Sequence, residues 1–189
     1  MKKVDNVKRI TGVAILLAIE IVLQAMGNYI TPSVVSINLS LIPIALGAII
    51  YGPFAGALLG FINGLVVLLS PSTEAFLSYS LFGTIVVCLL KCTIAGFLSG
   101  LFYKLISKKN SLVGSIVASL VVPVVNTGLF VVGVFTIFFG LFQPIGSTDE
   151  IMKYVFLVMI GWNFVIEFSL TAILSPIIAR IINITKKEE

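Results

Sequence analysis

Histidine is absent from this 189-residue chain, and cysteine occurs only twice. Without histidine the chain cannot form His-containing zinc sites, Ser–His or Cys–His nucleophilic pairs, or histidine-ligated haem. Cys88 and Cys92 lie four residues apart within an apolar segment, which favours two buried side chains over a redox pair. These absences argue against an enzyme, and we expect neither a metal nor a cofactor.

Charged residues are also scarce, and the sequence contains no phosphate-binding loop. Charged residues make up 11% of the chain, whereas soluble domains have about 25%. Hydrophobic residues make up 59%, compared with about 45–50% in soluble domains. This composition is typical of an integral membrane protein.

Because no GxxxxGK[ST] motif is present, we expect no nucleotide hydrolysis by this chain. The basic residues lie beside apolar runs, where they orient a membrane protein, so we expect no nucleic-acid partner.

The apolar runs predict an all-α integral membrane protein with six transmembrane helices in one compact bundle. A spanning helix uses about 20 residues, which leaves room for about six spans and no water-soluble domain. We therefore expect a single membrane domain over residues 1–189. The predicted spans are residues 10–29, 39–51, 53–69, 81–106, 112–142 and 154–182. The segments between these spans, including residues 70–80 and 143–151, are expected to be loops, and the fifth span is expected to bend at Pro123.

The distribution of basic residues predicts that both termini are cytoplasmic. In the six-span topology Lys153 alone lies outside, and Lys91 lies within the membrane. The other ten of the twelve Lys and Arg residues fall on the cytoplasmic side: Lys2, Lys3, Lys8, Arg9, Lys104, Lys108, Lys109, Arg180, Lys186 and Lys187. Such a bias matches the positive-inside rule, and an odd number of spans would remove it.

Four glycines at a spacing of four residues form the most regular pattern in the chain. They are Gly52, Gly56, Gly60 and Gly64. On a helix this spacing aligns the glycines along one edge, where the backbone of another helix can approach closely. The sequence Tyr51-Gly52-Pro53 interrupts the apolar run, so we expect two helices in a tight hairpin.

Three ionisable residues fall inside the predicted spans, namely Glu20, Lys91 and Glu167. A charge at the centre of the bilayer costs about 2.5–3.5 kcal/mol even on the insertion scale, so each needs a partner or a function. They could pair with one another and fix the register of the helices. Alternatively, Lys91 could bind a negative charge on a ligand.

Several uncharged residues could complete a binding site for a small polar molecule with a flat or apolar part. Asn126 and Asn163 are amides inside the fifth and sixth spans, and Trp162 is the single tryptophan. Each could instead serve only in helix–helix contacts. The candidate substrate-binding residues are Lys91, Asn126, Trp162, Asn163, Glu167, Asn38 and Tyr79.

The chain resembles the substrate-binding S components of energy-coupling factor (ECF) vitamin transporters. The resemblance rests on the segment IPIALGAIIYGPFAGALLG at residues 42–60, on Ala14 and Ala18 in the first span, and on the six-span topology. It implies a high-affinity binding subunit in a prokaryotic plasma membrane that takes up a water-soluble vitamin. It also implies that Ala14 and Ala18 dock on a transmembrane coupling protein, which acts together with two ATPase subunits.

The residues also bear on the identity of the vitamin. Lys91 favours an anionic substrate, so pantothenate is the first candidate and riboflavin the second. The alternative function is a stand-alone secondary transporter in which Glu20 or Glu167 binds a proton, although the two halves of the chain show no convincing repeat. An intramembrane enzyme is disfavoured because no paired acidic motif faces a loop.

Overall fold

The computed structural model describes residues 2–30 and 38–185, which form helices and no strand. Within these ranges the side chains of residues 2–5, 28–30, 158–160, 162, 163, 175, 176 and 178–185 are not described. The elements are α1 (Lys2–Ile30), α2 (Leu41–Tyr51), α3 (Pro53–Leu68), the 3-10 helix η1 (Pro71–Thr73), α4 (Glu74–Tyr79), α5 (Leu81–Ile106), α6 (Ser111–Thr136), α7 (Phe139–Phe142), the 3-10 helix η2 (Gln143–Ile145), α8 (Thr148–Lys153), the π-helix η3 (Tyr154–Gly161) and α9 (Trp162–Thr185). The predicted all-α class is confirmed.

Three helices in the described part are long and apolar enough to cross a membrane, which supports the predicted membrane character. They cover Asn6–Gly27, Leu81–Ile106 and Ser111–Thr136. A fourth candidate is α3 taken together with the segment Pro71–Tyr79, which bends away from it by 77°. The helix α2 is apolar but short. Six spans and the cytoplasmic position of both termini remain predictions.

Two segments expected to be loops are in part helical, and one predicted span is broken. Residues 70–80 contain η1 and α4, because this turn buries Phe76 at 6% exposure. Residues 148–153 form α8, whose start is capped by reciprocal hydrogen bonds between Ser147 and Glu150. The fifth span was expected to continue to residue 142, but α6 ends at Thr136, and the break buries Phe138 at 1% exposure.

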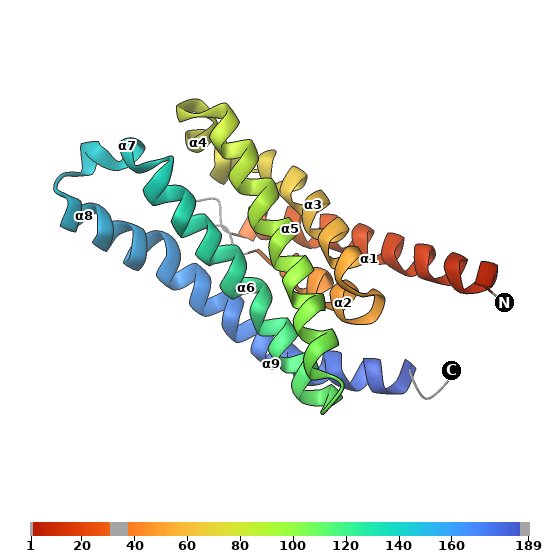
Figure 1. Cartoon of the computed structure of the whole chain (residues 1–189). Coiled ribbons are helices and arrows are strands. Elements are labelled where there is room, and N and C mark those ends of the chain that lie inside the picture. Colours follow the sequence, from red (N-terminus) through yellow and green to blue (C-terminus); the bar gives the residue numbers. More distant parts are fainter. Residues whose placement is uncertain (1, 31–37, 186–189) are drawn as a thin grey trace.

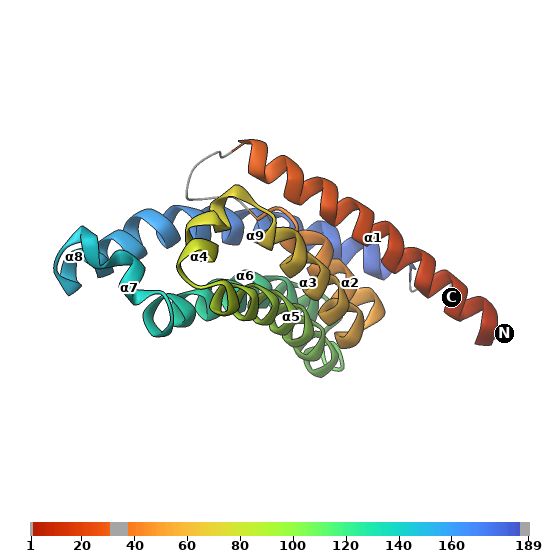
Figure 2. The same cartoon turned by 90° about the horizontal axis from the view of Figure 1, so that it is seen from above.

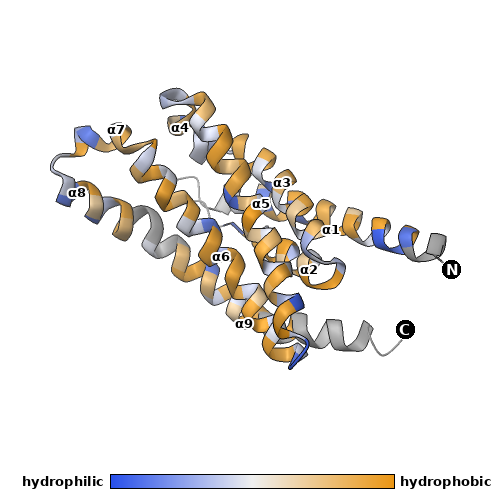
Figure 3. Cartoon of the chain, viewed as in Figure 1, coloured by the Kyte–Doolittle hydropathy of each residue, from blue (hydrophilic) through white to orange (hydrophobic). Residues whose placement is uncertain are grey.

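The helices run mainly along one long axis (Figure 1). The start of α1, the turn between α2 and α3, the connection between α5 and α6, and the end of α9 lie toward one end. The elements α4, α7 and α8 lie toward the other end, and the turned view in Figure 2 agrees. Figure 3 shows strongly polar residues near these ends and mostly apolar residues along the helices between them.

The glycine pattern lies where α3 packs against α5. A Cβ atom added at Gly56 would lie 2.4 Å from the carbonyl oxygen of Gly96, and one at Gly60 would lie 2.1 Å from that of Cys92. At Gly64 the corresponding distance, to the carbonyl oxygen of Cys88, is 2.8 Å. Such contacts require glycine, because any side chain would force the two backbones apart.

The expectation that Gly52 belongs to the same packing edge is wrong. Its φ angle is +93°, and no atom lies within 4 Å of the position that a Cβ would take. Gly52 lies between the end of α2 and Pro53, the first residue of α3. Glycine is favoured here because the hairpin turn needs a positive φ, not because another helix approaches.

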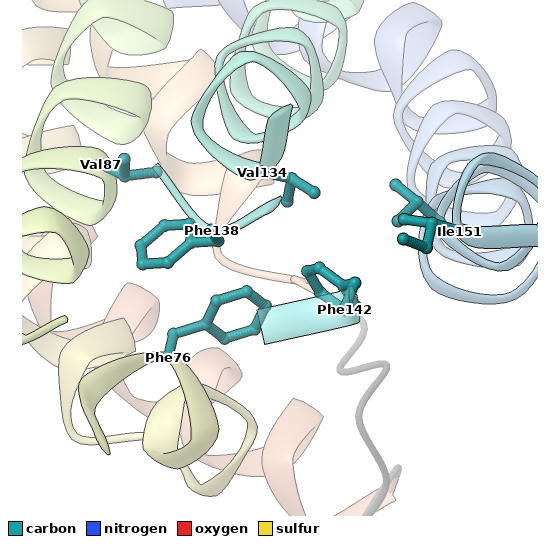
Figure 4. Packing of buried hydrophobic residues seen from close by; sticks show 7 residues of the cluster. Phe76, Val87, Val134, Phe138, Phe142 and Ile151 are labelled. Carbon is teal, nitrogen blue, oxygen red and sulfur yellow. The ribbon is translucent and has the colours of Figure 1, made fainter. Parts of the chain in front are cut away.

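Aromatic side chains from α4, α6 and α7 pack together at the end of the bundle opposite the termini. The ring of Phe76 lies 5.0 Å from Phe138, 6.1 Å from Phe142 and 5.7 Å from Phe130, measured between ring centroids. Figure 4 shows Phe76, Phe138 and Phe142 beside Val87 and Val134. These contacts hold the short elements α4 and α7 against the longer helices α5 and α6.

Candidate functional site

A group of buried polar side chains crosses the interior of the bundle. Its centre is the hydroxyl of Ser40, directly before α2. Ser40 Oγ lies 3.1 Å from Gln24 Oε1 on α1 and 2.7 Å from Asn63 Oδ1 on α3, and it also contacts Asn38 Oδ1. All four residues are less than a tenth exposed. The start of α2 is therefore joined to α1 and α3 through side-chain polar groups.

This set of buried polar side chains, here called the polar chain, continues through Cys92 to α6. Asn63 Nδ2 donates a hydrogen bond to Cys92 Sγ at 3.7 Å, and the Cys92 thiol donates to Asn126 Oδ1 at 3.5 Å. Cys92 and Asn126 are both buried. The candidate residue Asn126 is thus part of an intramolecular polar chain that links α3, α5 and α6.

Glu167 on α9 contacts the polar chain at Asn38. Its Oε1 accepts a hydrogen bond of 3.0 Å from the backbone N–H of Asn38. The Glu167 side chain is buried, at 5% exposure. The structure therefore brings the candidate residues Asn38 and Glu167 into direct contact.

Lys91 lies on α5, next to Cys92, but takes no part in this polar chain. Its ammonium group lies over the ring of Phe130, 5.0 Å from the ring centroid. No carboxylate among the described side chains forms an ion pair with Lys91 within 4.0 Å. The ion pairs of Lys91 with Glu20 or Glu167 that the sequence allowed are therefore not formed.

Glu20 is the third ionisable residue, and its side chain is fully buried on α1. Within the described part of the chain, neither carboxylate oxygen has a hydrogen-bond partner. It lies one helical turn before Gln24, so both side chains share one face of α1. Glu20 therefore faces the interior and not the lipid.

The opposite face of α1 is exposed. Ala14 and Ala18 lie on it, together with Ile15 and Val22, which are 55% and 57% exposed. The small side chains of the two alanines leave the backbone of α1 open to a close approach by another helix.

Residues 8–179 match the model of a family described as ECF transporter, substrate-specific component. The chain belongs to this family. It is therefore a transporter subunit and not an enzyme, and its family membership implies ECF membrane and ATPase subunits and a small-molecule substrate as partners. No curated protein and no solved structure gives a significant match to the chain.

Three other candidate residues of this substrate-specific component are not joined to the polar chain by described contacts. Tyr79 packs in the aromatic cluster, with its ring centroid 6.5 Å from that of Phe138 and its hydroxyl against Gly140. Trp162 and Asn163 belong to the first turn of α9, but their side chains lie outside the described residues.

The sequence reasoning missed four members of the polar chain in this substrate-specific component: Gln24, Ser40, Asn63 and Cys92, the last of which was expected only to fill apolar space. Asn63 interrupts the apolar run between Gly60 and Gly64, and Gln24 follows Glu20 by one helical turn. Both positions carried a signal, because a polar side chain within an apolar span needs a partner. Ser40 had no such signal, since serine is common before a helix.

Proposed function

We propose that this ECF substrate-specific component binds a water-soluble vitamin from outside the cell and delivers it together with a coupling protein and two ATPase subunits. Pantothenate, which carries a carboxylate, is the first candidate, and riboflavin is the second. The proposed location is the plasma membrane of a prokaryote, in a multi-pass topology. The observation that carries the choice of an anionic substrate is the partly buried Lys91, which lies over Phe130.

The energetics of Lys91 support a role in binding an anion. A cation–π contact contributes about 0.5–2 kcal/mol, while a charge at the centre of a bilayer costs about 2.5–3.5 kcal/mol on the insertion scale. Phe130 alone therefore offsets only part of the cost of Lys91. A substrate carboxylate beside the ammonium would supply the remaining stabilisation, since a charge-assisted hydrogen bond is stronger in a desolvated site.

The surroundings of Lys91 suit a ligand that has both polar and apolar parts. Phe130 joins Lys91 to the aromatic cluster through its edge contact with Phe76. Asn126 lies one turn before Phe130 on α6 and offers a polar group. Tyr79, Trp162 and Asn163 remain proposed members of the site.

Binding by the isolated chain tests this function directly. The purified protein in lipid nanodiscs is expected to bind radiolabelled pantothenate in preference to riboflavin. In liposomes with a proton gradient, and without ATPase partners, it is expected to bind the vitamin without concentrating it. Binding of neither vitamin would reject both candidates.

A second candidate function is a stand-alone proton-coupled carrier. The buried carboxylate of Glu20, which lacks a hydrogen-bond partner among the described residues, is the observation that favours it. Accumulation of substrate by the single chain, driven by a proton gradient, would support this carrier and contradict the ECF mechanism. Uptake that requires the coupling protein, the ATPase subunits and ATP would support the ECF mechanism.

A further inference from the structure

We propose that Asn126 donates a hydrogen bond from Nδ2 to an oxygen of the substrate, and that Cys92 is the positioning residue that holds the amide in this orientation. This role rests on the proposed transport function and specifies which atom of α6 meets the substrate. Both side chains are buried, and they contact each other across the interface between α5 and α6.

The Cys92 thiol lies between two amides and has a single hydrogen. Asn63 Nδ2 lies 3.7 Å from Cys92 Sγ. Because an amide nitrogen can only donate, the sulfur is the acceptor of this bond. The thiol hydrogen is then available to Asn126 Oδ1, which lies 3.5 Å from the sulfur. The hydrogen bonds therefore run in one direction, from Asn63 through Cys92 to Asn126.

This direction is set at Asn63. Its Oδ1 lies 2.7 Å from Ser40 Oγ, which can donate a hydrogen bond to it. Since the oxygen lies on the side of Ser40, the Nδ2 group lies on the side of Cys92. All three residues are buried, and hydrogen bonds in such a low-dielectric interior are stronger than in water.

The same direction determines which end of the Asn126 amide is left over. Its Oδ1 accepts from Cys92, and among the described residues no hydrogen bond involves its Nδ2. In the opposite orientation Nδ2 would face a sulfur that already accepts a bond from Asn63, and the thiol hydrogen would lose this acceptor. Asn126 is only 5% exposed, and a buried donor without a partner is costly. The Nδ2 group is therefore a donor that a ligand oxygen can satisfy.

Asn126 and Lys91 lie in the same part of the interface between α5 and α6. Phe130, over which the Lys91 ammonium lies, follows Asn126 by one turn, about 6 Å along α6. Lys91 also lies close enough to the Cys92 thiol to interact with it electrostatically. The substrate class that fits both groups is a carboxylate with a carbonyl oxygen nearby. Pantothenate belongs to this class, because two methylene groups separate its carboxylate from an amide.

The infrared S–H stretch tests the orientation of the amide without any vitamin. In nanodisc-embedded protein, Cys88→Ala removes the other cysteine, so the band then reports Cys92 alone. Adding Asn126→Leu is expected to shift this band to the frequency of a free thiol, because the acceptor is removed. Adding Asn63→Leu should leave the band at the frequency of a bonded thiol. The reverse pattern would overturn the proposal, and the Asn126→Leu spectrum alone decides if Asn63→Leu fails to fold.

Pantothenate affinity then tests the role of Nδ2. Asn126→Asp keeps an oxygen for the thiol but replaces the donor by an acceptor, and should weaken binding about tenfold or more. Cys92→Ala should weaken binding about three- to tenfold, and Cys92→Ser, which again has a donor, should restore it. Cys88→Ala, the matched change at the second buried cysteine of α5, should bind as the wild type does. Unfolding temperatures of the same samples separate these effects from a general loss of stability.

The two experiments distinguish a failure of this role from a failure of the proposed function. If Asn126→Asp binds pantothenate as tightly as the wild type, Nδ2 does not meet the substrate, while the transport function stands. If the wild type binds neither vitamin, the proposed substrates are rejected, and a donor to pantothenate is rejected with them. The S–H spectra decide the orientation of Asn126 in either case.

Discussion

The backbone N–H of Asn38 donates a buried hydrogen bond of 3.0 Å to Glu167 Oε1, which joins positions 129 residues apart. This bond ties α9 to the chain directly before α2. At 11 residues α2 is about 16 Å long, roughly half the thickness of the hydrocarbon core. Where a helix starts inside a membrane protein, the polar groups of its backbone need partners from the protein. Glu167 provides such a partner for the N–H of Asn38, whereas the Ser40 side chain makes no capping hydrogen bond to α2.

Replacing Glu167 by leucine should destabilise the protein. The change leaves the N–H of Asn38 buried without an acceptor, which costs about 1.5–3 kcal/mol for a hydrogen bond to a charged group. Glu167→Gln retains a side-chain oxygen and should lose much less. Unfolding in detergent and hydrogen exchange at the amide of Asn38 measure the difference. Equal stability and equal exchange in the two variants would show that this bond does not stabilise the start of α2.

Replacing Lys91 by methionine should weaken vitamin binding by about 2–4 kcal/mol, since the substrate carboxylate would be buried without its partner. Stability should not fall, because no carboxylate among the described side chains forms an ion pair with Lys91 and Phe130 offsets only part of the cost of its charge. Equilibrium binding and thermal unfolding on the same sample separate these effects. Lys104→Met, at the exposed end of the same helix, is the matched control and should bind as the wild type does. Unchanged affinity in Lys91→Met would remove the main reason for an anionic vitamin.

Replacing Ala14 or Ala18 by tryptophan should block uptake while leaving vitamin affinity nearly unchanged. Both alanines are exposed on α1, so a large side chain is accommodated in the free subunit but prevents close docking of a partner helix. The test measures affinity in nanodiscs and ATP-dependent uptake in the full complex. Val132→Trp, at a position of α6 that is 56% exposed, should leave uptake intact. Loss of affinity in the alanine variants would instead indicate that these residues support the fold of the subunit.

Replacing Gly60 by alanine should destabilise the contact between α3 and α5 by about 1–3 kcal/mol, the usual range for overpacking. The new methyl group would lie 2.1 Å from the carbonyl oxygen of Cys92, which belongs to a helix backbone and cannot rotate away. Gly128→Ala is the control, because no atom lies within 4 Å of its added Cβ. At that helical site alanine should stabilise by about 0.5–1 kcal/mol. Similar unfolding temperatures for the two variants would contradict the close packing.

The candidate site was only partly predictable from the sequence. Lys91, Asn126 and Glu167 were singled out because polar groups inside apolar spans are conspicuous. Their partners were not predictable, since an ion pair of Lys91 with a glutamate and a contact with Phe130 are equally compatible with the spacing. The same limit applies to Gln24 and Asn63, whose shared partner Ser40 lies before a third helix, α2.

The membrane character, the helical class and the family were predictable from the sequence, because they follow from composition, from the length of the apolar runs and from motifs within single spans. It also marked the break at Gly52, although the reason for that glycine is its positive φ. Which buried groups meet depends on how the helices pack. Asn38 reaches Glu167, and Ser40 gathers the oxygens of Gln24 and Asn63, because helices distant in the chain pack side by side. Local periodicity fixes the face of a helix on which a residue lies, whereas the residue opposite it depends on the packing of the whole bundle.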